Sequence, residues 1–231
     1  MKNNFDSILA GLRGGLIVSC QAPVESPLHD PMVIAAMAEA AINQGAVGVR
    51  IDTPDHIRAV RQRVSAPIIG LWKQQIPGCE VYITPQFEHA QAIAAAGADI
   101  IAIDATLRDR PGGETMAGLI QQIHQTLNKP VMADIDTLEA AVAAADAGAN
   151  WVGTTLYGYT AETRRNTPPA YGLLTDLRQK LSVPAICEGG VASPQMARKA
   201  LDLGAYAVVV GTAITGIDAQ VRAYQGALSG D

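Results

Sequence analysis

A short motif, Gly-Ala, recurs four times along the 231 residues and constrains the whole chain. Its glycines are Gly45, Gly97, Gly148 and Gly204, and each pair follows an Ala-rich amphipathic run and precedes a short apolar run. Glycine adopts the left-handed backbone conformation that ends many helices, because it has no β-carbon to clash. Each pair therefore predicts the end of a helix and, directly after it, a strand.

A second pattern, a proline before an apolar run, falls between the Gly-Ala pairs. It occurs at Pro67, Pro130 and Pro184. Proline ends a helix and is tolerated at the first position of a strand. Together with the first apolar run, the two patterns predict eight strands, at 16–20, 47–50, 68–72, 100–104, 131–134, 151–154, 185–188 and 207–211.

Helical patterns fill the intervals, at 31–44, 54–64, 88–96, 115–127, 138–147, 170–181, 194–203 and 217–228. Asp30, Thr53 and Ser193 each precede a proline, which predicts a capping side chain followed by proline at the first helical position. The strands are continuously apolar, as expected when both faces of a parallel sheet are buried. Eight such units predict an α/β fold, a (β/α)8 TIM barrel, with 1–231 as a single domain and 1–14 as its N-terminal lead-in. A doubly wound open sheet is the lesser alternative, since it does not require eight units.

The composition excludes several classes of protein. Lys plus Arg is 17 and Asp plus Glu is 22, a net charge of −5, so we expect no nucleic-acid partner and no anionic membrane surface. No run reaches the roughly 18 apolar residues of a membrane span, and the N-terminus does not resemble a signal peptide. Cys20, Cys79 and Cys187 are too few for a disulfide scaffold and lack metal-ligand spacing. We therefore expect a cytoplasmic protein without a metal site.

All eight predicted strands end in a polar residue or in glycine. In chain order these residues are Gln21, Arg50, Lys73, Asp104, Asp134, Thr154, Glu188 and Gly211. The carboxyl ends of the strands form the active site of a TIM barrel. Burying charges in one basin costs several kcal/mol each unless they are paired. Mutual pairing across the barrel mouth is the purely structural alternative, but the complete ring favours a functional site.

Glycines also follow the seventh and eighth predicted strands. Gly189 and Gly190 follow one, and Gly211 with Thr212 ends the other. Glycine lets backbone N–H groups approach a ligand, and a helix N-terminus favours an anion. The loops after strands 7 and 8 are the usual phosphate site of this fold. We therefore expect a phosphorylated ligand there.

Lys73 and Glu188 are the reactive groups that remain, since no nucleophile stands beside a base and no metal-ligand cluster is evident. Proton abstraction next to a carbonyl group needs a base and a second group that stabilises the enolate, which suits this pair. Desolvation or a neighbouring cation such as Arg50 can tune a lysine for this task. A Schiff base at Lys73 is a competing use of the same amine.

Several segments of the chain carry a resemblance to a known family. They are 16–21, 68–73, 98–104, 132–134, 153–160, 188–189 and 211–215. In combination they are similar to the N-acetylmannosamine-6-phosphate 2-epimerase family, over about residues 15–228. The resemblance implies an isomerase that interconverts N-acetylmannosamine 6-phosphate and N-acetylglucosamine 6-phosphate in amino-sugar and sialic-acid catabolism. It also implies a homodimer and no metal or organic cofactor.

The same resemblance implies a role for each site residue. Lys73 would accept and return the proton at C2, and Glu188 would be the second catalytic group. One base acting on both faces after a bond rotation, or two bases on opposite faces, both fit. The implied binding residues are Gln21, Arg50, Asp134 and Thr154 for the sugar, and Gly189, Gly190, Gly211 and Thr212 for the phosphate.

Two alternative functions stay open at this point. One is another phosphate-binding barrel enzyme, either similar to thiamine-phosphate synthase or a lyase that forms a Schiff base. The other is a sugar-phosphate binder without catalysis. The second arises from Gly216, which stands where members of the family commonly have arginine. The loop 74–85 has no role that its sequence indicates.

Overall fold

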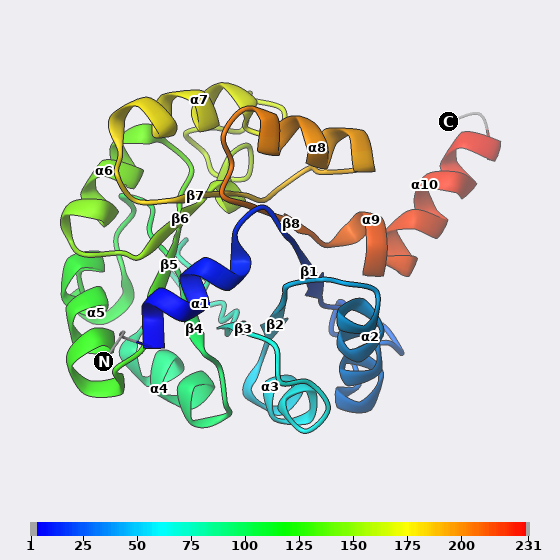
Figure 1. Cartoon of the computed structure of the whole chain (residues 1–231), viewed down its shortest axis with the longest axis horizontal. Helices are drawn as coiled ribbons and strands as arrows, with labels where there is room; N and C mark the ends of the chain where they lie inside the picture. Colours follow the sequence, from blue (N-terminus) through cyan, green and yellow to red (C-terminus); the bar gives the residue numbers. More distant parts are fainter. Residues whose placement is uncertain (1–3, 230–231) are drawn as a thin grey trace.

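The computed structural model describes residues 4–229, and the eight strands in this part of the chain close into one barrel (Figure 1). The strands are β1 (Leu16–Cys20), β2 (Gly48–Asp52), β3 (Ile68–Leu71), β4 (Ile100–Asp104), β5 (Val131–Asp134), β6 (Trp151–Gly153), β7 (Ala185–Cys187) and β8 (Ala207–Val210). Each strand pairs in parallel with the next along the chain, and β8 pairs with β1. The predicted (β/α)8 TIM barrel is confirmed. The predicted single domain, 1–231, extends beyond the described residues at both ends and stays a prediction.

Helices surround the strands (Figure 1). They are α1 (Asn4–Leu12), α2 (Pro31–Asn43), α3 (Pro54–Arg61), α4 (Phe87–Ala95), α5 (Met116–Gln122), α6 (Leu138–Asp146), α7 (Tyr171–Lys180), α8 (Pro194–Asp202), α9 (Thr212–Thr215) and α10 (Ile217–Ser229). The predicted helix 115–127 is α5 continued by a π-helical turn, Ile123–Leu127. Within residues 4–229, none of these helices combines the length and the apolarity needed to span a bilayer.

The Gly-Ala pairs and the predicted helix caps have the expected local geometry, with one exception. The glycines of the four Gly-Ala pairs have φ between 94° and 110°, as a helix C-terminus requires. The carboxylate of Asp30 accepts the N–H groups of Met32 and Val33, and the hydroxyl of Ser193 caps α8. The predicted cap at Thr53 is wrong, because Thr53 has φ 71° and its hydroxyl binds no N–H group of α3.

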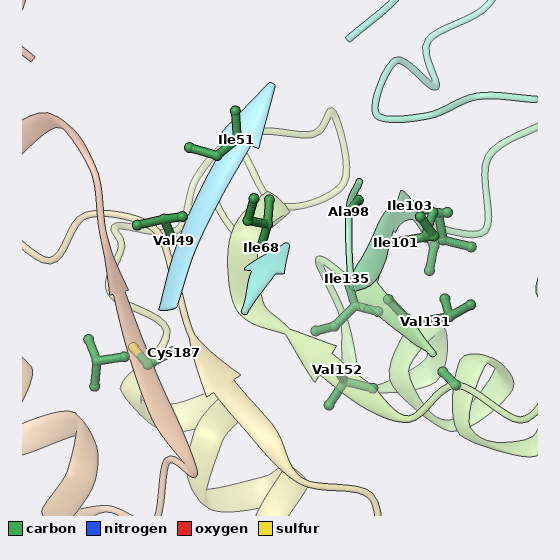
Figure 2. Packing of buried hydrophobic residues seen from close by; sticks show 14 of the residues in the cluster. Val49, Ile51, Ile68, Ala98, Ile101, Ile103, Val131, Ile135, Val152 and Cys187 are labelled. Carbon is green, nitrogen blue, oxygen red and sulfur yellow. The ribbon is translucent and has the colours of Figure 1, made fainter. Parts of the chain in front are cut away.

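Side chains alternate along each strand between the barrel interior and the surrounding helices. Figure 2 shows outward-facing residues, among them Val49, Ile51 and Ile68, in the cluster that packs against the helices. The inward-facing residues form a second buried cluster that includes Ile69 and Trp151. Leu12 at the end of α1 belongs to this inner cluster, and Figure 1 shows α1 across one end of the barrel.

The same alternation places the functional side chains. Ile69 and Leu71 face the interior, so Lys73, two residues further, also faces inward. Ile186 places Glu188 inward in the same way. Arg50 was expected at the end of its strand, but β2 continues to Asp52. Arg50 therefore lies inside the barrel, where it is buried.

Candidate active site

A cavity of about 500 Å³ opens at the carboxyl ends of the strands. Eight of the ten predicted site residues line it, namely Gln21, Arg50, Lys73, Glu188, Gly189, Gly190, Gly211 and Thr212. Asp134 and Thr154 do not reach its wall. The ends of several strands therefore converge on one cavity, while Asp134 and Thr154 each contact a residue that lines it.

Arg50 connects two carboxylates at the base of the cavity. Its Nη1 and Nη2 donate to the two oxygens of Asp134 at 3.1 Å and 2.6 Å. Nη1 also lies 3.1 Å from Oε2 of Glu188. A bidentate pair fixes the plane of a guanidinium group, so Asp134 determines how Arg50 faces the cavity. Burial alone would lower the pKa of Arg50, but attraction by Asp134 and then Glu188 raises it above its ordinary value.

Glu188 is placed to exchange protons near neutral pH. Burial raises its pKa to about 7, while the Arg50 guanidinium acts in the opposite direction. Within residues 4–229, its Oε2 has the ion-pair contact with Arg50 but accepts no well-aligned hydrogen bond. A carboxyl group with this pKa is present in both protonation states at neutral pH, so it can act as an acid and as a base.

Lys73 approaches the cavity from the opposite wall, just beyond β3. Its Nζ donates a hydrogen bond to the side-chain oxygen of Gln21, which extends from the end of β1. Lys73 and Gln21 also line an adjoining chamber of about 600 Å³. The two side chains therefore form part of the partition between two spaces, and the amine is accessible from both.

The sequence prediction placed Thr154 in the site, but the neighbouring Thr155 lines the cavity instead. β6 ends at Gly153, and the 3₁₀ turn Thr154–Leu156 follows it. Thr154 is fully buried, and its hydroxyl is engaged with the backbone of Glu188. Thr155 lines the cavity and donates to Asp134 at 2.6 Å. Strand alternation does not extend through this turn, so the sequence has no periodic signal that identifies Thr155.

The loop 74–85 closes one side of the cavity. It returns to the barrel through a bridge between Lys73 and Ile83 and a bond from the N–H of Gln74 to the carbonyl of Tyr82 at 2.9 Å. Ile83 is buried in the inner cluster, and Tyr82 lines the cavity. Burial, with Asp134 and Asp104 nearby, raises the pKa of Tyr82 to about 12, so its phenol is a neutral donor. No local sequence pattern identifies Tyr82, because a tertiary contact brings it to the site.

The glycine loops form the far end of the cavity. Gly190 has φ 67°, and a β-carbon there would lie 2.6 Å from Cβ of Pro168. Within residues 4–229, the N–H groups of Gly189, Gly190 and Thr212 donate no hydrogen bond to another protein group. Free N–H groups at the edge of a cavity suit an anionic ligand.

The remaining reactive side chains do not add to this site. Burial raises the pKa of Cys20 to about 12 and that of Cys187 to about 11, so both thiols stay protonated. In the described part of the chain, no three His, Cys, Asp or Glu side chains are grouped as metal ligands. The chemistry of the cavity is therefore that of an amine, a carboxyl group and a guanidinium.

A family profile and several curated proteins match most of the chain. The profile of a family described as "Putative N-acetylmannosamine-6-phosphate epimerase" matches residues 34–229. A protein of Thermosynechococcus vestitus is 64% identical over 217 residues, covering 94% of each chain, and one of Synechococcus elongatus is 62% identical over 223 residues, covering 96% of each. Both are named "Putative N-acetylmannosamine-6-phosphate 2-epimerase".

Solved structures are similar as well. The N-acetylmannosamine-6-phosphate 2-epimerase from Clostridium perfringens has a TM-score of 0.91 at 37% identity, covering 94% of this chain and 95% of that one. A thiamine phosphate pyrophosphorylase from Pyrococcus furiosus has a TM-score of 0.62 at 16% identity, which shows a shared fold alone. The chain belongs to the N-acetylmannosamine-6-phosphate 2-epimerase family.

Proposed function

We propose that this protein interconverts N-acetylmannosamine 6-phosphate and N-acetylglucosamine 6-phosphate by removing and returning the proton at C2. One observation carries the proposal. Lys73 and Glu188, from different strands, line one cavity whose far end offers free backbone N–H groups. Membership of the family supports the choice of substrate. The protein would act in the cytoplasm, in amino-sugar and sialic-acid catabolism.

Lys73 acts as the base in this account. The two sugars differ only in configuration at C2, and in the open-chain form C2 is adjacent to the C1 aldehyde. The aldehyde acidifies the C2 proton, because the electrons left behind delocalise onto the C1 oxygen. A neutral amine on Lys73, at the cavity wall, accepts this proton. Rotation about the C2–C3 bond then turns the opposite face of the enolate toward the amine, which returns a proton there and inverts C2.

Glu188 and Arg50 stabilise the charge that develops on the C1 oxygen. With a pKa of about 7, Glu188 is partly protonated at neutral pH and donates its proton to that oxygen. Arg50, 3.1 Å from Glu188, adds a fixed positive charge in a site from which water is largely excluded. Charges that are already in place when the enolate forms need no reorganisation, which is what makes them effective.

The other predicted residues divide into two groups. Gln21 and Arg50 line the cavity and are proposed to bind the sugar, while Gly189, Gly190, Gly211 and Thr212 bind the phosphate. Asp134 and Thr154 act through other residues. Asp134 orients Arg50, and Thr154 holds the backbone of Glu188.

The direct test is a proton NMR time course with N-acetylmannosamine 6-phosphate in D₂O. The proposal expects loss of the C2 proton signal and appearance of N-acetylglucosamine 6-phosphate. Binding without turnover would support the sugar-phosphate binder instead. Trapping of substrate on Lys73 by borohydride would support the Schiff-base lyase.

We also propose a homodimer, on the basis of α10. Figure 1 shows α10 extending away from the barrel, and in this helix, which lies wholly in the described part of the chain, no residue is buried. Four large apolar side chains share one of its faces and are 53–81% exposed, namely Ile217, Val221, Tyr224 and Leu228. An apolar groove of about 630 Å³ lies between α2 and α9, lined by Leu16, Val18, Met37 and Ile214 among others.

A second copy of the chain would cover both the exposed face of α10 and the groove, because the apolar face of α10 from one copy can pack into the groove of the other. Sedimentation analysis of the double variant Val221→Asp, Tyr224→Asp tests the proposal. The wild-type protein is expected as a dimer and the variant as a monomer. A wild-type monomer at micromolar concentration would contradict it.

A further inference from the structure

The carboxylate of Asp52 contacts Lys73 at two points. Its Oδ1 accepts the backbone N–H of Lys73 at 3.0 Å, and its Oδ2 lies 3.8 Å from Nζ of the same residue. The Asp52 side chain is only 16% exposed. One carboxylate therefore holds both the backbone and the amine of the proposed base. The sequence prediction missed Asp52, because it placed the end of the second strand at Arg50.

The register of the barrel places Asp52 at this point. Asp52 is the last residue of β2 and is paired with Leu71, the last residue of β3, two residues before Lys73. The N–H of Thr53 donates to the carbonyl of Leu71 at 3.0 Å, which keeps the two strand ends together. The carboxylate is thus directed by two hydrogen-bonded strands rather than by a free loop.

One buried ring lies behind Asp52. It belongs to His56, in α3, and is close to the backbone of Asp52. Burial, and then the neighbouring ring of His29, lower the pKa of His56, so its ring stays neutral at physiological pH. The rings of His29 and His56 meet edge to face, with centroids 4.6 Å apart. Asp52 consequently has little freedom to move away from Lys73.

The contacts of Nζ leave one direction for the substrate. An ammonium group has three N–H donors and no acceptor. One N–H of Lys73 is directed to Gln21, and a second faces Asp52. The third is then the proton that must leave before Lys73 can accept the C2 proton. Removing it creates the lone pair at the position that the two contacts do not occupy.

Asp52 is also the nearest negative charge to the amine. The other titratable groups that line the two spaces beside Lys73 are Arg50, Tyr82, Tyr159 and Glu188 on one side and His29, Asp218 and Arg222 on the other. The Asp52 carboxylate therefore faces the amine directly, 3.8 Å from Nζ, and restrains the direction in which the amine points.

We propose that Asp52 is the positioning residue for Lys73: it fixes the backbone and the amine of the base and directs its lone pair toward C2. This inference rests on the proposed function of Lys73. Asp52 is assigned no contact with the substrate and no proton transfer of its own.

The variant Asp52→Asn tests the electrostatic part, because the amide oxygen can still accept the N–H of Lys73 while the charge is lost. We expect kcat to fall about tenfold with KM changed less than about twofold, since the variant alters the base and not the binding groups. Asp52→Glu keeps the charge and should recover part of the kcat that Asp52→Asn loses.

Asp99→Asn is the matched control. The Asp99 carboxylate also holds the backbone of β3, accepting the N–H of Ile68 at 2.9 Å, and it pairs with Arg61, but it lies at the opposite end of the strand. This variant should lower Tm and leave kcat unchanged. An Asp52→Asn protein with the wild-type kcat, or an Asp99→Asn protein with the same loss of kcat, would overturn the proposal. Absence of C2 exchange in the wild-type protein would instead refute the proposed function.

Discussion

The hydroxyl of Thr154 bridges the two backbone polar groups of Glu188. It donates to the carbonyl oxygen of Glu188 at 2.8 Å and accepts its N–H at 3.1 Å. Thr154 is fully buried, so no solvent competes for these bonds. The residue that follows β6 thereby fixes the backbone of the residue that follows β7, and through it the carboxyl group proposed to be catalytic.

Replacing Thr154 by valine should therefore affect both stability and catalysis. The substitution leaves two buried backbone groups without partners, which costs about 1–3 kcal/mol of unfolding free energy. It should also lower kcat about tenfold with a smaller change in KM, because Glu188 loses its support. Denaturant unfolding and steady-state kinetics measure the two effects. Thr154→Ser keeps the hydroxyl and should retain most of kcat, and equal losses in both variants would contradict the role of the hydroxyl.

The pH dependence should report the proton on Glu188. Because burial raises its pKa to about 7, Glu188 is protonated below that pH and loses its proton above it. The account needs a protonated Glu188, so kcat/KM should fall as pH rises above about 7. The phosphate of the substrate titrates near pH 6, outside this range. Glu188→Gln should lower the rate about a hundredfold and remove the alkaline limb. A limb that persists in this variant belongs to another group.

Asp134→Asn should move the alkaline limb of kcat/KM to lower pH. The negative charge of Asp134 helps to raise the pKa of Glu188, and Asp134 also engages the guanidinium of Arg50. Removing the charge lowers the pKa of Glu188, and a guanidinium less engaged by Asp134 interacts more strongly with it. The alkaline limb of kcat/KM should therefore shift to lower pH, below the wild-type value. A shift to higher pH would show that the coupling through Arg50 is wrong.

The loop after β7, which is proposed to bind the phosphate, should be sensitive to a methyl group added at Gly190. Alanine there requires φ 67°, which disfavours any residue with a β-carbon, and places that carbon 2.6 Å from Pro168. Displacement of the loop should raise KM for the phosphorylated sugar about tenfold or more, with a smaller effect on kcat. Gly172→Ala is the control, since this exposed position in α7 has space for a methyl group. It should leave KM unchanged and increase stability by up to about 1 kcal/mol. Equal KM values in the two variants would contradict the assignment of the loop.

The fold could be predicted because its determinants are local. Each Gly-Ala pair requires a left-handed glycine at a helix end, and each strand is apolar along its length, so counting these units gives the barrel. The inward direction of Lys73 and Glu188 follows from the same alternation that directs Ile69 and Ile186 inward. These parts of the site can therefore be predicted without knowing which distant residues are in contact.

The remaining parts depend on register and tertiary contacts. The sequence prediction names Thr154, but Thr155 lines the cavity, because a 3₁₀ turn after Gly153 interrupts the strand alternation. Asp52 was missed because β2 continues two residues past Arg50, which only its pairing with β3 determines. Tyr82 reaches the cavity through a loop that folds back beside Lys73, and no periodic pattern in the sequence marks such a return.

The central claim is that the amine of Lys73 moves the C2 proton. The measurement is C2 proton exchange of N-acetylmannosamine 6-phosphate in D₂O, followed by proton NMR with wild-type protein, Lys73→Ala and the exposed-surface control Lys180→Ala. Circular dichroism confirms that each variant is folded. We expect Lys180→Ala to exchange at the wild-type rate and Lys73→Ala to lose exchange by about 10²–10⁴-fold or more, the contribution of a general base. A folded Lys73→Ala protein that exchanges the C2 proton at the wild-type rate would contradict the account.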